Sequence, residues 1–165
     1  MEELLNDFKG KLEQELKLNL REGVKFDGKF STTKNGNLDL SELREDIKKH
    51  FQVKSAKSIQ GIYKIYINDS LFYIGMSKSS IFSRIKRHYS KYEKSVLTNS
   101  PKRYTFFDKL VNTENKVMIE IIRMQGKELN YILLIEELLT LSEKPMYKDN
   151  INNEIKVNKD TSLDS

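Results

Sequence analysis

Residues 61–88 constrain the possible fold more than any other part of the chain. The segment begins with an alternating apolar run over residues 61–67, and a second run of apolar and aromatic residues follows over 71–74. Between the two runs lies Asn68-Asp69-Ser70, whose residue types favour tight turns. This pattern predicts two antiparallel strands joined as a β-hairpin.

The same segment continues as a basic helix. Apolar or aromatic residues recur at helical spacing, at Ile81, Ile85 and Tyr89. Arg84 and His88 are four residues apart, so both lie on one face of this helix. The segment therefore gathers a guanidinium and an imidazole close to the two tyrosines of the hairpin.

The remaining elements are predicted from apolar periodicity and from turn residues. We expect helices at 3–20, 39–51, 105–111 and 127–142, a hairpin or ordered loop at 24–37, and a third strand at 116–123. The helix at 127–142 is apolar almost all round, which predicts a central position. The expected fold class is α/β (α+β), with a small, mainly antiparallel three-stranded sheet (61–67, 71–75 and 116–123) flanked by helices.

A small, polar stretch at 54–58 predicts the boundary between two parts of the chain. Residues 1–58 are expected to form an N-terminal helical extension with a role in target recognition, and residues 59–148 the main domain. Residues 149–165 are rich in Asn, Lys and Asp, so we expect a disordered polar tail.

Composition excludes several classes of protein and site. The chain of 165 residues has the length of one domain with an extension. It contains no cysteine, which excludes disulfides, thiolate zinc sites and cysteine nucleophiles. No apolar run approaches the roughly 20 residues that cross a bilayer, so we expect a soluble, intracellular protein without a membrane partner.

Positive charge is concentrated in one part of the chain. Residues 76–110 contain nine Lys or Arg and only two acidic residues, whereas the whole chain has a net charge of +5. Six aromatic residues are interleaved with these charges: Phe82, Tyr89, Tyr92, Tyr104, Phe106 and Phe107. Such a pattern suits a phosphate backbone, although a solvated helix over buried aromatics has the same composition.

Two tripeptides of the hairpin match a known signature. Gly61-Ile62-Tyr63 and Tyr73-Ile74-Gly75, with their tyrosines ten residues apart, resemble the signature of the GIY-YIG nucleases. In that family an arginine on the first helix follows the second tripeptide by eight or nine residues. Arg84 stands nine residues beyond Gly75.

The resemblance continues toward the end of the main domain. His88 occupies a position, one helical turn after the arginine, where these nucleases frequently carry a histidine. The family's metal-binding glutamate commonly precedes a Pro-x-Tyr-Asn segment by nine residues, and Glu136 precedes Pro145 by nine. Five elements thus match in order and spacing between residue 61 and about residue 148, which implies a GIY-YIG nuclease domain.

Two positions depart from the pattern or leave it ambiguous. Lys148 stands where an asparagine that steadies the family's site often follows Pro-x-Tyr, and Asn150 is close enough to replace it after a small shift. Glu137 adjoins Glu136, and neighbouring helix residues point about 100° apart, so only one of them can be the ligand. The spacing to Pro145 favours Glu136.

Phosphodiester hydrolysis requires a nucleophilic water, a cation near the scissile phosphate and stabilisation of the developing charge. Glu136 would hold one Mg²⁺, or Mn²⁺ in its place, since these ions prefer oxygen ligands. Arg84 can bind the phosphate through its fixed fork of donors. Tyr63, with an ordinary pKa of about 10, is a poor base unless nearby cations depress that pKa.

The resemblance implies roles for the remaining site residues. Tyr63 would be the general base or would position the water. Tyr73 and His88 would hydrogen-bond to the phosphate, the water or Tyr63, and proton relay by His88 is the alternative. The predicted catalytic set is therefore Tyr63, Tyr73, Arg84, His88 and Glu136, with Glu136 as the metal ligand.

The implied function is a Mg²⁺-dependent DNA endonuclease of restriction or phage type, in the cytoplasm of a prokaryotic or phage-infected cell. Six basic residues are expected to contact DNA: Lys78, Lys86, Arg87, Lys91, Lys102 and Arg103. Double-strand cleavage by one active site favours a homodimer on symmetric DNA or sequential nicking. A DNA-binding protein with weakened chemistry, and an RNA-directed nuclease or toxin, stay open because phosphate contacts do not distinguish these cases.

Overall fold

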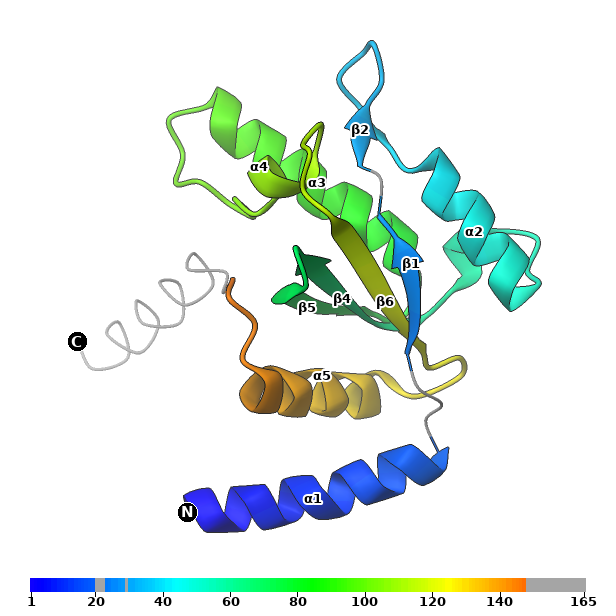
Figure 1. The fold of residues 1–165 in the computed structure, drawn as a ribbon, viewed down its shortest axis with the longest axis vertical. Helices are drawn as coiled ribbons and strands as arrows, with labels where there is room; N and C mark the ends of the chain where they lie inside the picture. Colours follow the sequence, from blue (N-terminus) through cyan, green and yellow to red (C-terminus); the bar gives the residue numbers. More distant parts are fainter. Residues whose placement is uncertain (20–22, 29, 148–165) are drawn as a thin grey trace.

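The computed structural model describes residues 1–19, 23–28 and 30–147, which are arranged around a four-stranded antiparallel sheet with the order β1-β6-β4-β5 (Figure 1). β4 (Gly61–Ile67) and β5 (Ser70–Ser77) form the predicted hairpin. Its turn residues Asn68 and Asp69 have φ angles of 50° and 67°, as a two-residue type I′ turn requires. β6 (Val117–Arg123) pairs with the other side of β4, so the predicted third strand is confirmed.

The sheet has four strands and not the predicted three, because β1 (Val24–Asp27) pairs with the outer side of β6. The sequence predicts only a hairpin or loop here, since the strand has four residues and ends at Asp27-Gly28, a typical turn dipeptide. Its stability as a strand depends on a partner far along the chain, with Phe26 facing Ile119. The N-terminal segment therefore supplies an edge strand of the main sheet.

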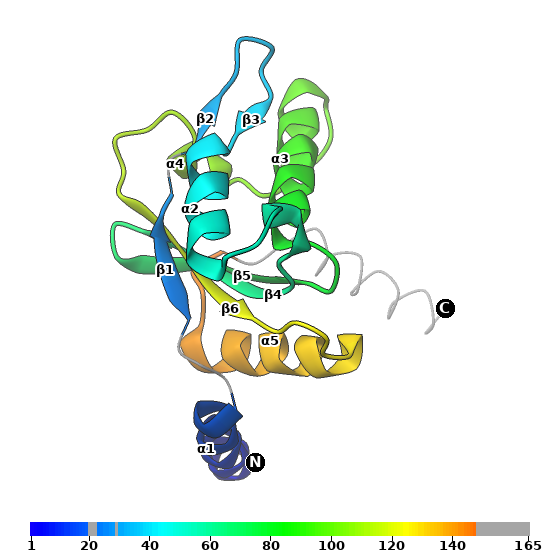
Figure 2. The ribbon, with the colours of Figure 1, turned by 90° about the vertical axis from the view of Figure 1, so that its right-hand side faces the viewer.

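Helices cover both faces of this sheet (Figures 1 and 2). α2 (Ser41–Phe51), α3 (Ile81–Leu97) and the short α4 (Phe107–Leu110) pack on the face that carries Tyr63 and Ile65. α5 (Leu129–Glu143) packs on the opposite face, against Ile62 and Ile74. α1 (Glu2–Asn19) lies beyond α5 in Figure 1. The mixed architecture is of the α+β kind.

Local sequence signals account for the helix ends. The Ser80 hydroxyl accepts a hydrogen bond from the backbone N–H of Ser83 at 3.1 Å, which caps the start of α3. The Asp39 carboxylate accepts one from the N–H of Ser41 at 3.0 Å, at the start of α2. α5 ends at Glu143, one residue before a left-handed Lys144 and two before Pro145, as the sequence predicts.

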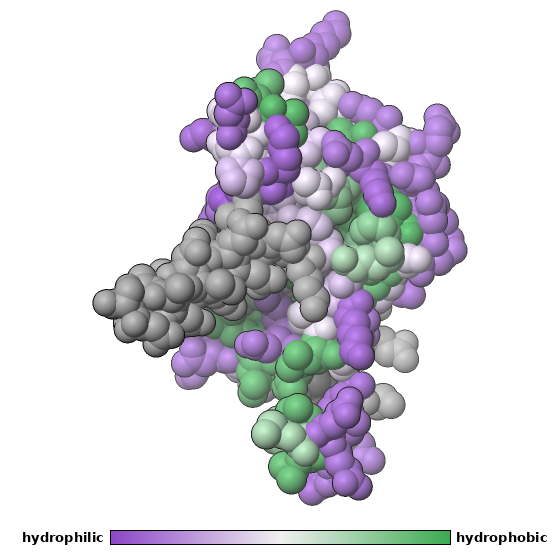
Figure 3. All heavy atoms as spheres, turned by 90° about the vertical axis from the view of Figure 1, so that its left-hand side faces the viewer, coloured by the Kyte–Doolittle hydropathy of each residue, from purple (hydrophilic) through white to green (hydrophobic). Residues whose placement is uncertain are grey.

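The prediction of a central α5, buried on all sides, is wrong. Ile132 and Ile135 are buried against the sheet, but Leu134 is 46% exposed and Leu141 is 61% exposed. Apolar side chains, drawn in green, gather in the lower half of Figure 3, where α1 and α5 lie. An apolar composition shows that a helix can be buried, but it does not show that enough other elements exist to surround it.

The remaining predicted elements are present where the structure describes them. β2 (Ser31–Thr32) and β3 (Leu38–Asp39) pair around the predicted turn at 34–37. The predicted helices at 3–20, 39–51 and 105–111 correspond to α1, α2 and α4. Leu20, Lys148 and the predicted polar tail at 149–165, which contains Asn150, lie outside the described residues.

Candidate active site

Tyr63 and Gly75 face each other across the central hairpin. They are directly paired in the β4–β5 register, and a Cβ atom on Gly75 would lie 2.5 Å from Cζ of Tyr63 and 2.6 Å from its hydroxyl oxygen. Gly61 has a φ of 139°, and a Cβ atom there would lie 2.1 Å from the carbonyl oxygen of Ile122. Both glycines of the two tripeptides are therefore required sterically, and Gly75 makes the space that the Tyr63 ring fills.

Tyr73 lies on the same face of the sheet as Tyr63, since it pairs with Ile65, two residues further along β4. The ring centroids of the two tyrosines are 5.8 Å apart. Tyr73 also stacks on Phe106 at 5.0 Å and 21°, and meets the His88 ring edge-on at 6.0 Å. These contacts restrict the ring of Tyr73 to one orientation.

His88 is carried by α3 to the hydroxyl of Tyr63. Its side chain is buried, at 2% exposure, and Nδ1 lies 3.4 Å from the Tyr63 hydroxyl oxygen, which is long for a hydrogen bond. Burial lowers the pKa of His88 to about 3, and nearby positive charges, Arg84 foremost, act in the same direction. The imidazole is therefore neutral at pH 7.

Arg84 lies one turn before His88 on α3 and is half-buried. Its Nε atom is buried and has no hydrogen-bond partner among the described residues. Its positive charge acts to lower the pKa of Tyr63, of Glu136 and of His88. A buried donor without a partner is unusual and is available to an anion that enters the site.

Glu136 reaches the same group from α5. Burial raises the pKa of its carboxyl to about 7, and Arg84 opposes this increase. The negative charge of Glu136 in turn acts to raise the pKa values of Tyr63 and Tyr73. Glu136 is half-buried whereas Glu137 is exposed. Of the two adjacent carboxylates, Glu136 is the more buried and the one whose charge acts on both tyrosines.

Tyr63 and Tyr73 are protonated at neutral pH. Burial raises the pKa of Tyr63 well above its ordinary value, and this outweighs the opposite effects of Arg84 and of the hydrogen bond with Tyr73. Burial likewise raises the pKa of Tyr73. The condition under which Tyr63 could act as a base, a pKa depressed by nearby cations, is therefore not met: its side chain is only 1% exposed and a phenolate there would be poorly solvated.

Glu136 is the one residue of the predicted catalytic set that carries a carboxylate. Within the described residues, no three His, Cys, Asp or Glu side chains come together as a metal-binding group. A single half-buried carboxylate with a raised pKa nonetheless suits a hydrated Mg²⁺, which keeps several waters and would favour the ionised form. The donor set at Glu136 therefore fits one weakly held hard cation.

The basic residues that were expected to contact DNA differ in their surroundings. Three of them are exposed: Lys78 lies between β5 and α3, and Arg87 and Lys91 lie on α3. Lys102 donates to the carbonyl oxygens of Ser95 and Val96, at 3.0 and 3.3 Å, so its ammonium group caps the end of α3. Arg103 lies over the ring of Tyr104, 5.5 Å from its centroid.

Lys86 belongs to a group of cations from three elements. Cζ of Arg44 on α2 and Nζ of Lys86 on α3 lie over the Phe82 ring, 5.1 and 5.2 Å from its centroid. Burial lowers the pKa of Lys86, and the charges of Arg44 and Lys57 lower it further while Asp39 opposes them. Sequence reasoning identified Lys86 but missed Arg44 and Lys57, which lie outside the basic stretch at 76–110.

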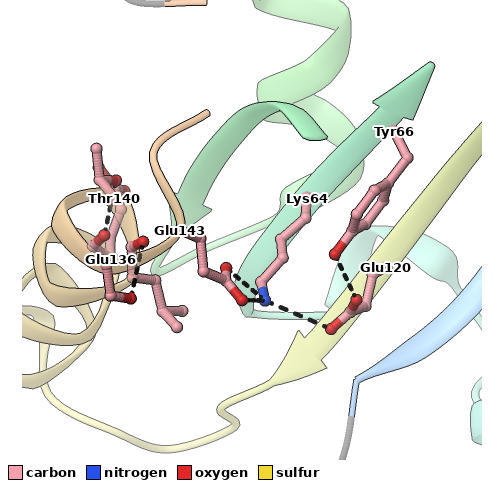
Figure 4. Close-up of polar contacts among 8 residues, drawn as sticks. Lys64, Tyr66, Glu120, Glu136, Thr140 and Glu143 are labelled. Carbon is pink, nitrogen blue, oxygen red and sulfur yellow. Dashed lines mark hydrogen bonds and ion pairs between the residues drawn. The ribbon is translucent and has the colours of Figure 1, made fainter. Parts of the chain in front are cut away.

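A second polar cluster, which the sequence analysis did not identify, ties α5 to the face of the sheet on which it packs. Lys64 is buried, and its Nζ lies 2.8 Å from Oε2 of Glu143 and 3.7 Å from Oε2 of Glu120. Tyr66 donates to Oε1 of Glu120 at 3.0 Å. Figure 4 shows Glu143 reaching from α5 to Lys64, on the same helix that carries Glu136. These contacts fix α5, and with it Glu136, relative to β4.

Tyr147, in the Pro-x-Tyr segment, holds a further residue of the site, Tyr104, which was not among the predicted site residues. The hydroxyl of Tyr147 accepts a hydrogen bond from the backbone N–H of Tyr104 at 2.6 Å. The Tyr104 ring stacks on His88, with centroids 4.2 Å apart and ring planes 11° apart. In the sequence, Tyr104 was marked only by its place in the basic, aromatic stretch at 76–110, so its contact with His88 could not be predicted.

No helix in the described ranges is both long enough and apolar enough to span a membrane. Comparisons of the chain with protein-family models, with curated proteins and with solved structures found no match.

Proposed function

We propose that this protein is a Mg²⁺-dependent DNA endonuclease with a GIY-YIG-type active site, of restriction or phage type. One observation carries the proposal: side chains chosen only by their spacing in the sequence converge on Tyr63. Its hydroxyl lies 3.4 Å from Nδ1 of His88, and its ring centroid lies 5.8 Å from that of Tyr73. The charges of Arg84 and Glu136 both act on its pKa. The five residues come from β4, β5, α3 and α5, and they are Tyr63, Tyr73, Arg84, His88 and Glu136. Separate structural roles for these residues would not require such a meeting.

Arg84 is the proposed phosphate ligand. Its buried Nε donor has no hydrogen-bond partner within the described ranges, and its charge acts on Tyr63 and on Glu136. A guanidinium can donate two parallel hydrogen bonds to a phosphodiester and remains charged as negative charge develops on the phosphate. The arrangement supports a role in binding the scissile phosphate and in stabilising the transition state.

Glu136 is the proposed ligand of one Mg²⁺. When bound, the ion would supply charge stabilisation at the scissile phosphate and lower the pKa of a nearby water. The charge of Arg84 beside Glu136 favours the ionised carboxylate that such a site needs. Glu120 and Glu143 both pair with Lys64, whereas the charge of Glu136 acts on Tyr63 and Tyr73.

Tyr63 is proposed to position the attacking water. A protonated phenol is a poor general base, but its oxygen can accept a hydrogen bond from water while its proton points to an acceptor. Nδ1 of His88, when unprotonated, is such an acceptor at 3.4 Å. Tyr73 packs beside Tyr63 and limits the volume in which the water can lie.

Binding of nucleic acid is supported by cations beyond the catalytic group. One set of cations consists of Arg44, Lys57 and Lys86, which lie near one another. Positive charges so placed repel each other, and binding of an anion would relieve this repulsion. Arg87 and Lys91 are exposed on α3. We propose that both sets contact the DNA backbone and that the segment before residue 58 takes part in target binding.

The test is a cleavage assay on plasmid, linear duplex and branched DNA in the presence of Mg²⁺. We expect the wild type to cut at least one of these substrates, and Tyr63→Phe and Arg84→Ala to lose at least about 100-fold in rate. Intact substrates under all conditions would contradict nuclease activity. Equal binding of DNA by the wild type and by Tyr63→Phe without cleavage by either would favour a DNA-binding protein on a weakened scaffold.

Sequencing the ends of cut genomic DNA separates the two proposed roles. A restriction enzyme leaves one fixed short sequence at all ends. A phage enzyme that degrades host DNA leaves a loose consensus with nicks. Parallel digestion of RNA tests the remaining alternative, since contacts to phosphate alone do not select the sugar.

A further inference from the structure

Tyr104 holds an unusual backbone conformation in a buried position. Its φ angle is 50°, in the left-handed region that residues with a side chain rarely occupy, and its side chain is 4% exposed. A strained backbone persists only where the surroundings enforce it, and such residues concentrate at functional sites. The contacts of Tyr104 therefore call for a functional explanation.

The backbone of Tyr104 is held from the far end of the main domain. The Tyr147 hydroxyl accepts the Tyr104 N–H at 2.6 Å. Tyr147 is in turn fixed on β5, since its own N–H donates to the carbonyl oxygen of Phe72 at 2.8 Å and that of Met146 donates to Leu71 at 3.0 Å. The loop before α4 is thus tied to the edge strand that carries Tyr73.

The ring of Tyr104 is held against the catalytic imidazole. It lies almost parallel to His88, at 11° and 4.2 Å between centroids, and edge-on to Tyr73 at 6.4 Å. A flat ring stacked on one side of the imidazole restricts rotation about the last side-chain bond of His88. Nδ1 of His88 then stays directed at the Tyr63 hydroxyl, 3.4 Å away.

We infer that Tyr104 is a positioning residue of the proposed nuclease site: its stacked ring fixes the His88 imidazole so that Nδ1 faces the Tyr63 hydroxyl. The inference rests on the proposed function for its catalytic consequence, but the orientation of His88 can be measured without any nuclease assay. Tyr147 supports the same arrangement by holding the backbone of Tyr104.

The test compares Tyr104→Leu with Tyr104→Phe. Leucine keeps an apolar side chain but removes the flat ring, whereas phenylalanine keeps the ring and removes only the hydroxyl. Nitrogen NMR of the His88 imidazole, assigned with a His88→Gln variant, reports its tautomer and its titration. Circular dichroism and thermal unfolding establish that each variant is folded.

The charged and titratable groups around His88 remain in these variants, so they do not explain a difference between them. They are Arg84, Arg87 and Lys91 on α3, Arg103 in the loop, Tyr63 on β4 and Tyr73 on β5. In the wild type and in Tyr104→Phe we expect a single tautomer that does not titrate near neutral pH. In Tyr104→Leu we expect averaged tautomers, titration closer to the ordinary pKa of about 6.5, and a kcat about 10- to 100-fold lower.

A His88 imidazole with the wild-type tautomer and titration in folded Tyr104→Leu would overturn the inference. Equal loss of the single tautomer in Tyr104→Phe would also overturn it, because the hydroxyl and not the stacked ring would then be responsible. If Tyr104→Leu does not fold, Tyr147→Phe, which removes only the acceptor of the Tyr104 N–H, is expected to produce the same averaging, and its absence would contradict the inference. If only the proposed function fails, the wild-type protein will show a single His88 tautomer by NMR but will cut no DNA.

Discussion

Replacing Gly75 by alanine should damage the candidate site without removing any of its functional groups. The added Cβ would lie 2.5 Å from Cζ of Tyr63, whereas carbon atoms in ordinary contact are about 3.5–4.0 Å apart. The phenol ring must therefore move by about 1 Å, in a position where its side chain is only 1% exposed. Overpacking of this kind costs about 1–3 kcal/mol, which a domain stable by about 5–15 kcal/mol survives.

The displaced ring should matter far more for activity than for stability. A shift of about 1 Å moves the Tyr63 hydroxyl away from Nδ1 of His88 and from the position of the attacking water, so we expect cleavage to slow by about 100-fold. Urea unfolding measures the first effect and a plasmid cleavage time course the second. Gly10→Ala is the matched control, because a Cβ there meets nothing within 4 Å. Gly75→Ala that unfolds and cuts like the wild type would refute the steric reasoning.

Three further predictions follow from individual side chains. Arg84→Lys keeps the charge but loses the fork of donors, so DNA cleavage should fall by about 100-fold while DNA affinity in a gel-shift assay stays similar; full activity would contradict this role. The pKa of His88 is about 3 in the fold against 6.5 for the free side chain, so the stability of the wild type should fall as pH decreases from 6.5 toward 3. In urea unfolding at several pH values His88→Gln should lose less stability over this range, and equal losses would count against a buried, neutral imidazole. Lys64→Met removes the cation 2.8 Å from the partly exposed Glu143 carboxylate and 3.7 Å from the buried Glu120 carboxylate. It should destabilise the fold by about 1–3 kcal/mol in calorimetry, whereas no change would show that the ion pair does not hold α5.

The central hairpin and α3 could be predicted because their signals are local. Alternating residues, an Asn-Asp turn and a Ser cap each act within a few positions of the chain. Tyr63, Tyr73, Arg84 and His88 all lie in this one segment, so correct local structure already brings them close together. Their meeting in the fold required no knowledge of distant contacts.

Features that depend on distant partners could not be predicted in the same way. β1 has four residues and is a strand because β6 pairs with it. Tyr104 stacks on His88, 16 residues earlier, and its backbone N–H donates to Tyr147, 43 residues later. The raised pKa of Tyr63 results from burial by several elements, which the positive charges in the sequence did not indicate. In each case the missing information is tertiary packing and not residue type.

Glu136 lies between these two situations. Its distance from Pro145 in the sequence identified it through the resemblance, but its position beside Arg84 depends on how α5 packs under the sheet. The ion pair of Lys64 with Glu143 sets that packing near the end of the helix. In the proposed function this carboxylate is the group that would hold the metal.

The most direct measurement is therefore Mg²⁺-dependent DNA cleavage by Glu136→Gln and Glu137→Gln, together with their DNA affinity in the absence of metal. Both variants lose one carboxylate from neighbouring positions of α5, but Glu136 is half-buried beside the site and Glu137 is exposed. We expect Glu136→Gln to bind DNA at least as well as the wild type and to cut it at least about 100-fold more slowly. Glu137→Gln should cut at the wild-type rate. Equal cleavage by Glu136→Gln and the wild type, or equal losses in both variants, would contradict a metal-dependent site built around Glu136.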